Sequence, residues 1–234
     1  MFIATCELIL HDNLFYASRE MGRTYETERY LHNYGLSYAL GSALGLARSY
    51  ANHSQVPAYR ADLRALTDRG IYVTPALPLE WGFAFHTFKL GEPAYYSFTP
   101  QVISNRVVYG RAKELTVGSR FECFVLSPQP LDLPRWVRLG KWMSKAALRV
   151  VRAESYEAHT PREAVAVHVP LNPLDCPAQQ LISFDIINMP PVPLLVNAHT
   201  TQLCYDVGAG GSGHDAHRYI PANLAYFGAE GRPA

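Results

Sequence analysis

Short apolar runs that end at proline or glycine dominate this sequence, and at most two or three stretches have the length and spacing of helices. The first run, Phe2–Leu10, is apolar at nearly every position, which is typical of a buried strand. A polar loop follows, and residues 31–44 then place apolar side chains on one broad helical face. Eight or more strands are expected in all. Because helices and strands do not alternate regularly, we predict an α+β fold with an antiparallel sheet and β-rich insertions.

The composition is that of a globular chain that can bury a core. Of the 234 residues 48% are hydrophobic and 18% are charged, and we assign residues 1–234 to a single domain with a glycine-rich tail from Gly208. There is no basic leader and no run of about 18 apolar residues, so we expect a cytoplasmic protein without a membrane span. The widely spaced cysteines are expected to be free, buried thiols: Cys6, Cys123, Cys176 and Cys204.

Charge is distributed unevenly, although the net charge of the chain is only +1. Residues 1–105 carry a net charge of −1, residues 106–152 carry +7 and residues 153–234 carry −5. A basic middle segment is typical of a surface that binds a polyanion, whereas the acidic final third suits a protein partner better than RNA. Of the 21 cations 17 are arginine, the side chain that best matches phosphate geometry.

The loop between the first strand and the first helix alternates arginine with tyrosine. Guanidinium groups form paired hydrogen bonds to phosphates and aromatic rings stack on bases, so this pattern favours single-stranded RNA. The plainer interpretation is a helix entrance in which Glu26 and Glu28 balance the arginines. The residues concerned are Arg19, Arg23 and Arg29, with Tyr16, Tyr25 and Tyr30 between them.

Residues 90–113 have the pattern of a hairpin with a basic, aromatic tip. Turn residues occur at Gly91 and Pro93, and cations gather around Gly110. We take this segment as a candidate thumb-like hairpin for RNA, and the alternative is an ordinary exposed hairpin. Its candidate RNA contacts are Asn105, Arg106, Arg111 and Lys113.

Residues 135–145 are the densest basic and aromatic segment of the chain. Four cations and two tryptophans stand in eleven residues that contain no acid. Gly140 lets the backbone adopt a positive φ or approach another group closely. The alternative is a basic surface helix, and in either case we expect Trp136 or Trp142 to be anchored in the core. The candidate RNA contacts are Arg135, Arg138, Lys141, Trp142 and Lys145.

Other motifs favour neither a cofactor nor a metal. Residues 208–213 match the dinucleotide pattern G-x-G-x-x-G, but no βαβ unit surrounds them. His199, His214, Asp215 and His217 lack the spacing of a zinc site. Metal-free RNA cleavage needs an imidazole base and a nearby cation, and the candidate bases are His11, His32 and His86.

Two stretches resemble one known family. LHDNLFYASREMGRTYETERYLHNYGLSYALG and LPRWVRLGKWMSKA are similar to the Cas-five-type subunit of type I-D CRISPR interference (Cascade) complexes. The resemblance is close over the first fifty residues, recurs in the second stretch and is weaker elsewhere. It implies a protein of the RAMP superfamily with an RRM/ferredoxin-like core that carries an inserted thumb hairpin.

The resemblance also implies a function. Such a subunit caps the foot of the complex, holds the repeat-derived 5′ handle of the guide RNA and touches the backbone and large subunits. Target DNA is read nearby, at the protospacer-adjacent motif. The subunit is expected to be non-catalytic, because a separate subunit processes the guide in type I-D systems. Carried onto this sequence, the handle contacts are Arg19, Arg23, Arg135, Arg138, Lys141 and Lys145.

Two alternatives stay open. A relative in another CRISPR subtype cuts the precursor RNA, so the first alternative is a metal-independent endoribonuclease that uses one of the three histidines. The second is an assembly protein without direct RNA contact, whose basic segment binds an acidic subunit.

Overall fold

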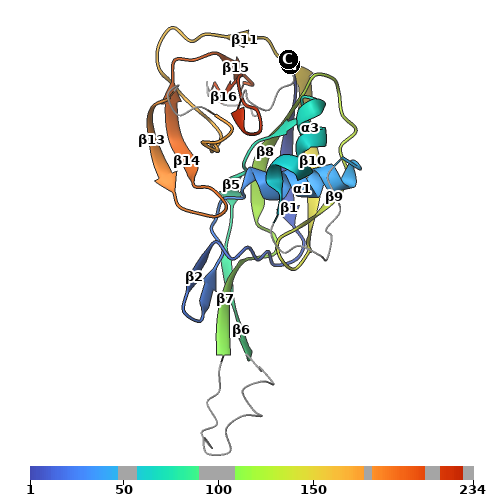
Figure 1. The fold of residues 1–234 in the computed structure, drawn as a ribbon, viewed down its shortest axis with the longest axis vertical. Helices are drawn as coiled ribbons and strands as arrows, with labels where there is room; N and C mark the ends of the chain where they lie inside the picture. Colours follow the sequence, from blue (N-terminus) through green and yellow to red (C-terminus); the bar gives the residue numbers. More distant parts are fainter. Residues whose placement is uncertain (47–56, 90–108, 177–180, 209–216, 229–234) are drawn as a thin grey trace, which may run out of the picture.

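The computed structural model describes residues 1–46, 57–89, 109–176, 181–208 and 217–228. Strands make up most of this part of the chain, and helices are few. Figure 1 shows a β-rich body from which two long strands, β6 and β7, project at one end. All strand pairs among the described residues are antiparallel except β3 with β7. The predicted antiparallel and β-rich character of the fold is therefore confirmed.

The central sheet is built around β1 (Phe2–Leu10), which lies between β8 (Arg120–Ser127) and β10 (Ser144–Ser155) and is antiparallel to both. The strand is buried along nearly its whole length, so its sequence is a continuous apolar run without a polar face. Its single acid, Glu7, accepts a hydrogen bond from Arg120 Nε at 2.6 Å, which satisfies the buried carboxylate.

Shorter strands complete the central sheet at both edges. Their order across the sheet is β4, β8, β1, β10, β9, and β5 also pairs with β8. The connection from β8 to β10 is fully described and contains a proline-punctuated loop and β9 but no helix. The bounds of these strands are Tyr72–Val73 for β4, Leu77–Glu80 for β5 and Trp136–Leu139 for β9.

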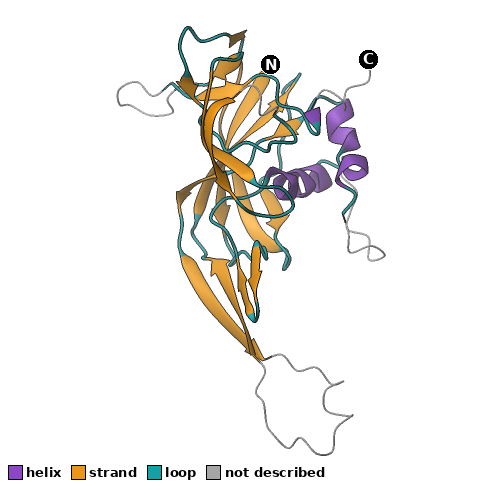
Figure 2. Ribbon diagram, turned by 60° about the vertical axis from the view of Figure 1, so that its left-hand side comes forward, coloured by secondary structure: helices purple, strands orange, loops and turns teal. Residues whose placement is uncertain are grey.

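Helices cover one face of the central sheet (Figure 2). The longest is α1 (Asn33–Ala43), which confirms the helix expected at residues 31–44. Next come α2 (Tyr59–Asp62) and α3 (Arg64–Asp68), with Leu63 and Leu66 completely buried against the sheet. Apolar side chains of α1 belong to the same core, so helices and sheet form one packed unit.

A second sheet forms the projecting arm, with strand order β2, β3, β7, β6. The hairpin β2–β3 lies within the segment that we predicted to be a polar loop. Sequence patterns missed it because the strands are only three residues long and Gly22, at a φ of +62°, makes the turn. The bounds are Arg19–Met21, Thr24–Glu26, Phe83–Lys89 and Tyr109–Leu115 for β2, β3, β6 and β7.

Two three-stranded sheets complete the fold, ordered β12, β14, β13 and β11, β15, β16. Most of their buried residues share one core cluster with the central sheet, whereas Leu194 and Val196 of β14 belong to a second cluster with Tyr30 and Met189. The bounds are Ala158–His159 for β11, Val165–Ala166 for β12, Leu181–Ile187 for β13, Leu194–Thr200 for β14, Cys204–Asp206 for β15 and Tyr219–Pro221 for β16.

A buried carboxylate fixes α1 to the rest of the body. Asp175 accepts hydrogen bonds from Asn33 Nδ2 (2.7 Å), Tyr34 OH (3.2 Å), Tyr72 OH (3.1 Å) and the backbone N–H of Phe227 (2.9 Å). Burial raises the pKa of Asp175 to about 6, although these four donors favour the ionised form. The position of α1 therefore depends on residues far away in the chain.

The cysteines agree with a further expectation. All four cysteines are free and buried, as the sequence indicated. Within the described ranges, no helix has the length and apolar character needed to cross a membrane.

Candidate nucleic-acid interface

A groove of about 1250 Å³ lies beside the basic segment 135–145. One wall is α1, which contributes Tyr34, Tyr38 and Ser42. The β9–β10 hairpin also lines the groove, and the loop from β13 to β14 contributes Met189, Pro190 and Pro191. The hairpin residues that line the groove are Trp136, Val137, Arg138, Leu139, Gly140, Lys141, Met143 and Lys145.

The turn from β9 to β10 is held against the chain that follows β1. Gly140 has a φ of +75°, and a Cβ atom there would lie 2.6 Å from Leu14 Cδ1 and 2.7 Å from Phe15 O. The backbone N–H of Lys141 donates to Phe15 O at 2.9 Å. Ser144 Oγ donates to the carbonyl of Asn13 at 2.6 Å. These contacts fix the direction in which the basic side chains leave the turn.

Both tryptophans of the segment are exposed, contrary to our expectation that one of them anchors in the core. Trp136 is 46% exposed and Trp142 is 51% exposed. Lys145 Nζ lies 3.9 Å from the centre of the Trp136 ring, and Trp142 stacks on Phe15 at 4.4 Å. The segment forms strands and a tight turn, so its own core contacts come from Val137 and Leu139, which alternate with the exposed side chains.

The helical wall of the groove is held by close contacts. The hydroxyl of Tyr16 lies so near to Gly35 of α1 that a Cβ atom there would be 2.8 Å from it. Burial raises the pKa of Tyr16 to about 12, so this phenol stays neutral at physiological pH. Tyr38 donates a hydrogen bond to Asp62 Oδ2 at 2.6 Å, which leaves its ring on the groove. The groove therefore combines aromatic walls with a basic side.

The arm separates its cations from its aromatic row. Residues paired across β6 and β7 share a face, so Lys113 lies with Phe85, and His86 lies on the opposite face. Lys113 Nζ is 4.1 Å from the centre of the Phe83 ring. On the other face, Tyr25 stacks with Phe88 at 6.3 Å. Arg111 lies on the basic face, over Phe85 at 5.8 Å.

Trp142 joins the aromatic face of the arm to the groove. Its ring meets His86 at 6.3 Å, edge to face, and it stacks on Phe15. The predicted contacts Tyr25 and Trp142 therefore belong to one row of rings, together with His86 and Phe88. By contrast, Arg111 and Lys113 lie on the opposite face of the arm, so the predicted arm residues do not form a single surface.

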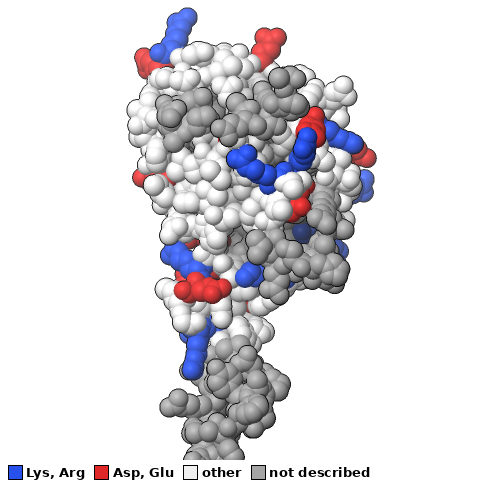
Figure 3. All heavy atoms as spheres, in the orientation of Figure 1, with Lys and Arg blue, Asp and Glu red and all other residues white. Residues whose placement is uncertain are grey.

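Of the arginines of the first loop, Arg19 lies on β2 and Arg23 in the turn that follows it. Arg19 Nη2 is 3.2 Å from Glu28 Oε2, so a carboxylate already balances part of its charge. Arg23 is exposed in the turn, and its carbonyl accepts a hydrogen bond from the N–H of Arg111 at 2.9 Å. In Figure 3 cations on this side of the arm lie beside acidic side chains. The interpretation in which acids balance the arginines thus describes Arg19 but not Arg23.

Three predicted residues lie elsewhere. Asn105 and Arg106, with most of the candidate thumb, fall outside the described residues. Arg135 is exposed immediately before β9, next to the groove-lining Trp136. The basic segment therefore contributes Arg138, Lys141 and Lys145 to the groove directly.

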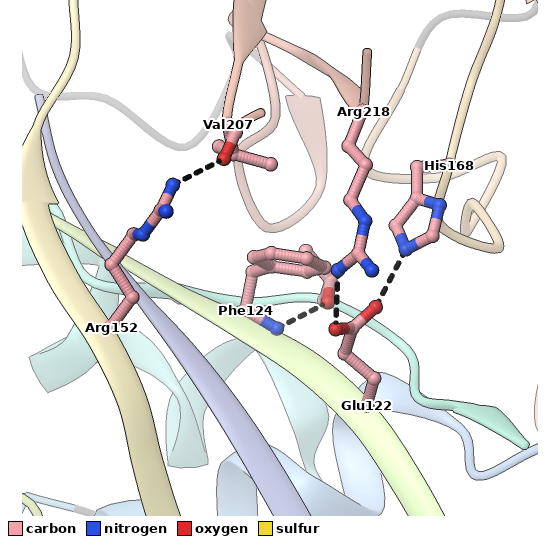
Figure 4. A network of polar contacts seen from close by, with 7 residues as sticks. Glu122, Phe124, Arg152, His168, Val207 and Arg218 are labelled. Carbon is pink, nitrogen blue, oxygen red and sulfur yellow. Dashed lines mark hydrogen bonds and ion pairs between the residues drawn. The ribbon is translucent and has the colours of Figure 1, made fainter. Parts of the chain in front are cut away.

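Sequence reasoning missed the groove's other wall and the ion-pair network shown in Figure 4. Glu122 on β8 binds His168 Nε2 at 2.6 Å and Arg218 Nη1 at 2.7 Å. Burial alone would raise the pKa of Glu122, but the hydrogen bonds and charges of these two partners outweigh it and hold the pKa below its usual value. Arg152 donates to the carbonyl of Val207, so one cation of the basic middle segment, residues 106–152, has a structural contact. No local pattern connects residues so far apart in sequence.

The three candidate catalytic histidines occupy different environments. His11 meets Trp136 edge to face at 4.9 Å, and His86 lies between Phe88 and Trp142. His32 is buried at the start of α1, where Nδ1 accepts from the N–H of Tyr34 and Nε2 donates to the carbonyl of Val192. Since both of its ring nitrogens are engaged, His32 has no free nitrogen to act as a base.

In the described part of the chain no cluster of three or more His, Cys, Asp or Glu side chains is arranged to hold a metal ion.

Replacing His32→Asn is expected to remove a pH dependence of stability. Burial lowers the pKa of His32 to about 4, below its unfolded value of 6.5, so unfolding takes up a proton between these values. Wild-type stability should therefore rise with pH across this window, by roughly 3 kcal/mol in total. Asparagine keeps the helix cap but does not titrate.

Urea denaturation of both proteins from pH 4.5 to 7 measures this difference. Asp175 has a raised pKa and acts in the opposite direction, but it is present in both proteins and cancels in the comparison. Parallel stability curves for wild type and His32→Asn would contradict the assignment of a neutral, buried His32.

The family of the chain follows from comparison with known proteins. A family model described as "Type I-D CRISPR-associated protein Cas5/Csc1" matches residues 1–229. The chain belongs to this family. Membership confirms the resemblance noted in the sequence, extends it beyond the two stretches that carry it, and makes the chain a CRISPR effector subunit.

No curated protein matches this member of the Cas5/Csc1 family. Among solved structures it is similar to a chain in a type III-B Cmr-beta complex bound to cognate target RNA and AMPPnP. That chain has 10% identity and a TM-score of 0.48, with 84% of this chain and 85% of that chain covered. A second chain, from a type III-B Cmr-beta complex bound to cognate target RNA, has 12% identity and a TM-score of 0.45. The match covers 84% of this chain and 86% of that chain.

Proposed function

We propose that this Cas5/Csc1 protein is a non-catalytic subunit of a type I-D RNA-guided DNA-targeting complex and binds the 5′ handle of the guide RNA in the groove. The observation that carries the proposal is the composition of the groove. Arg138, Lys141 and Lys145 line the groove together with Tyr34 and Tyr38. Cations neutralise phosphates, and aromatic faces stack on the unpaired bases of single-stranded RNA.

The aromatic row of the arm extends this binding surface. Tyr25, Phe88 and His86 lead to Trp142 at the edge of the groove. In this proposal the row stacks on bases of the handle, and the β6–β7 arm acts as the thumb. The subunit then caps the foot of the complex in the prokaryotic cytoplasm, next to the backbone and large subunits and to target DNA at the protospacer-adjacent motif.

The proposal also includes an RRM/ferredoxin-like core. The order β4, β8, β1, β10 places β1 and β4 on either side of β8, with the helices between β1 and β4 in the chain. This is the strand order of the β-α-β-β-α-β plan. The expected second helix is replaced by β9, so the groove wall formed by the β9–β10 hairpin occupies the connection that would otherwise be helical.

Purification of the tagged chain with its co-expressed operon tests this function. Short RNAs of uniform 5′ end, each with a repeat-derived handle, should copurify with the complex. Recovery of a protein complex without RNA would favour the assembly-protein alternative. Cleavage of a cognate repeat by the clean protein in chelator would instead favour the endoribonuclease, with His11 and His86 as the remaining candidate bases.

A further inference from the structure

An exposed apolar stripe lies on β13. Ile182 is 60% exposed, Phe184 is 38% exposed and Ile186 is 62% exposed. Leu181 and Ile187, at the two ends of the strand, pack against buried clusters instead. Side chains that face water on an antiparallel sheet are usually polar, and clustered exposed apolar residues mark binding surfaces.

The outer edge of β13 is free among the described residues. The sheet order is β12, β14, β13, so β14 occupies only one side of the strand. Free edges are usually protected by lysine or proline, and residues 181–187 contain neither. Asp185 is the single charge of the strand, and it accepts a hydrogen bond from Asn197 Nδ2 on β14 at 2.7 Å. The edge is thus open to strand addition.

The charge around this edge selects a protein rather than RNA. No lysine or arginine occurs between Arg162 and Arg218, while the same segment contains five acids. Figure 3 shows that uncharged atoms predominate on the face over β13 and β14. The segment that carries β13 therefore offers no cation to neutralise the phosphates of an RNA backbone. A second copy of this chain would add another strand with the same negative charge and no cation.

We propose that β13 docks an extended segment of another protein subunit of the same complex, which pairs with its free edge as an added strand. That segment carries apolar side chains at alternate positions, to cover Ile182, Phe184 and Ile186, and lysine or arginine near Asp185. The proposal rests on the proposed role in a multisubunit complex. The β13–β14 loop also lines the groove, so the docked subunit would border the RNA site.

Photocrosslinking identifies the occupant directly. p-Benzoylphenylalanine is placed at Phe184 in the co-expressed complex, with Val117, an exposed residue of a turn, as the control position. The expected product from position 184 alone is a crosslink to a different subunit, within a peptide of alternating apolar residues that also contains lysine or arginine. A crosslink to RNA, a crosslink to a second copy, or no crosslink would each overturn the proposal.

Substitution separates docking from RNA binding. The double variant Ile182→Arg with Ile186→Arg should reduce copurification of the crosslinked subunit by about tenfold or more. The matched control is Val117→Arg with Val151→Arg, which adds the same charge at two other exposed positions. RNA affinity of the isolated chain should be unchanged in both. Full retention of the subunit by the β13 variant would overturn docking and leave the RNA function untouched.

Discussion

Replacing Arg138 and Lys141 together by alanine is expected to weaken binding of the handle RNA about 30-fold. Both side chains line the groove, and each exposed cation–phosphate contact contributes on the order of 1 kcal/mol in water. The salt dependence should change as well. For single-stranded RNA, each lost phosphate contact makes the slope of log affinity against log salt shallower by about 0.7, so two contacts give about 1.4. Fluorescence anisotropy over a salt series measures both quantities.

The matched control removes the same charge elsewhere. Arg64 and Arg149 are exposed and do not line the groove, so Arg64→Ala with Arg149→Ala should leave affinity and slope close to wild type. Arg138 Nη1 also donates to the Met143 carbonyl across the turn at 3.1 Å, so thermal melting of each variant is compared. Lys141→Ala alone should produce about half of the slope change of the double variant. Equal losses in the groove variant and the control would mean that only overall charge attracts RNA.

The sequence predicted those parts of the fold in which the burial of one continuous segment determines its own residue pattern. Phe2–Leu10 coincides with β1 because a strand buried on both faces must be apolar along its length. The helical spacing at residues 31–44 likewise identified α1. The short strands β2 and β3 were not predictable, because β2 pairs only with β3 and β3 pairs with β7, which is distant in the chain.

The candidate site was predicted in composition but not in geometry. Arg138, Lys141 and Lys145 of the basic segment line the groove, and their role as RNA contacts stays a prediction. The separation of Lys113 from Tyr25 depends on the register of β3 against β7, and a shift of one residue would reverse the faces. The groove wall at 189–191 comes from a distant loop. Composition along the chain cannot give either feature.

Replacing Gly140→Ala is expected to destabilise the protein by on the order of 3 kcal/mol and to lower its melting temperature by roughly 6 to 12 °C. A φ of +75° costs an alanine about 1 kcal/mol, and its Cβ would collide with Leu14 and with the backbone oxygen of Phe15. That oxygen accepts the hydrogen bond from Lys141 and cannot withdraw without breaking it. The turn must therefore move away from the segment that holds it.

The control for this substitution is Gly118→Ala, which isolates the effect of the close approach. Gly118 has a similar φ of +85°, but a Cβ atom there meets nothing within 4 Å. Its alanine variant should lose only the backbone cost of about 1 kcal/mol. RNA affinity at a temperature where both variants are folded should fall only for Gly140→Ala, because Lys141 and Trp142 leave from the displaced turn. Equal melting temperatures for the two variants would show that the contact between the turn and Phe15 does not hold the basic side of the groove in place.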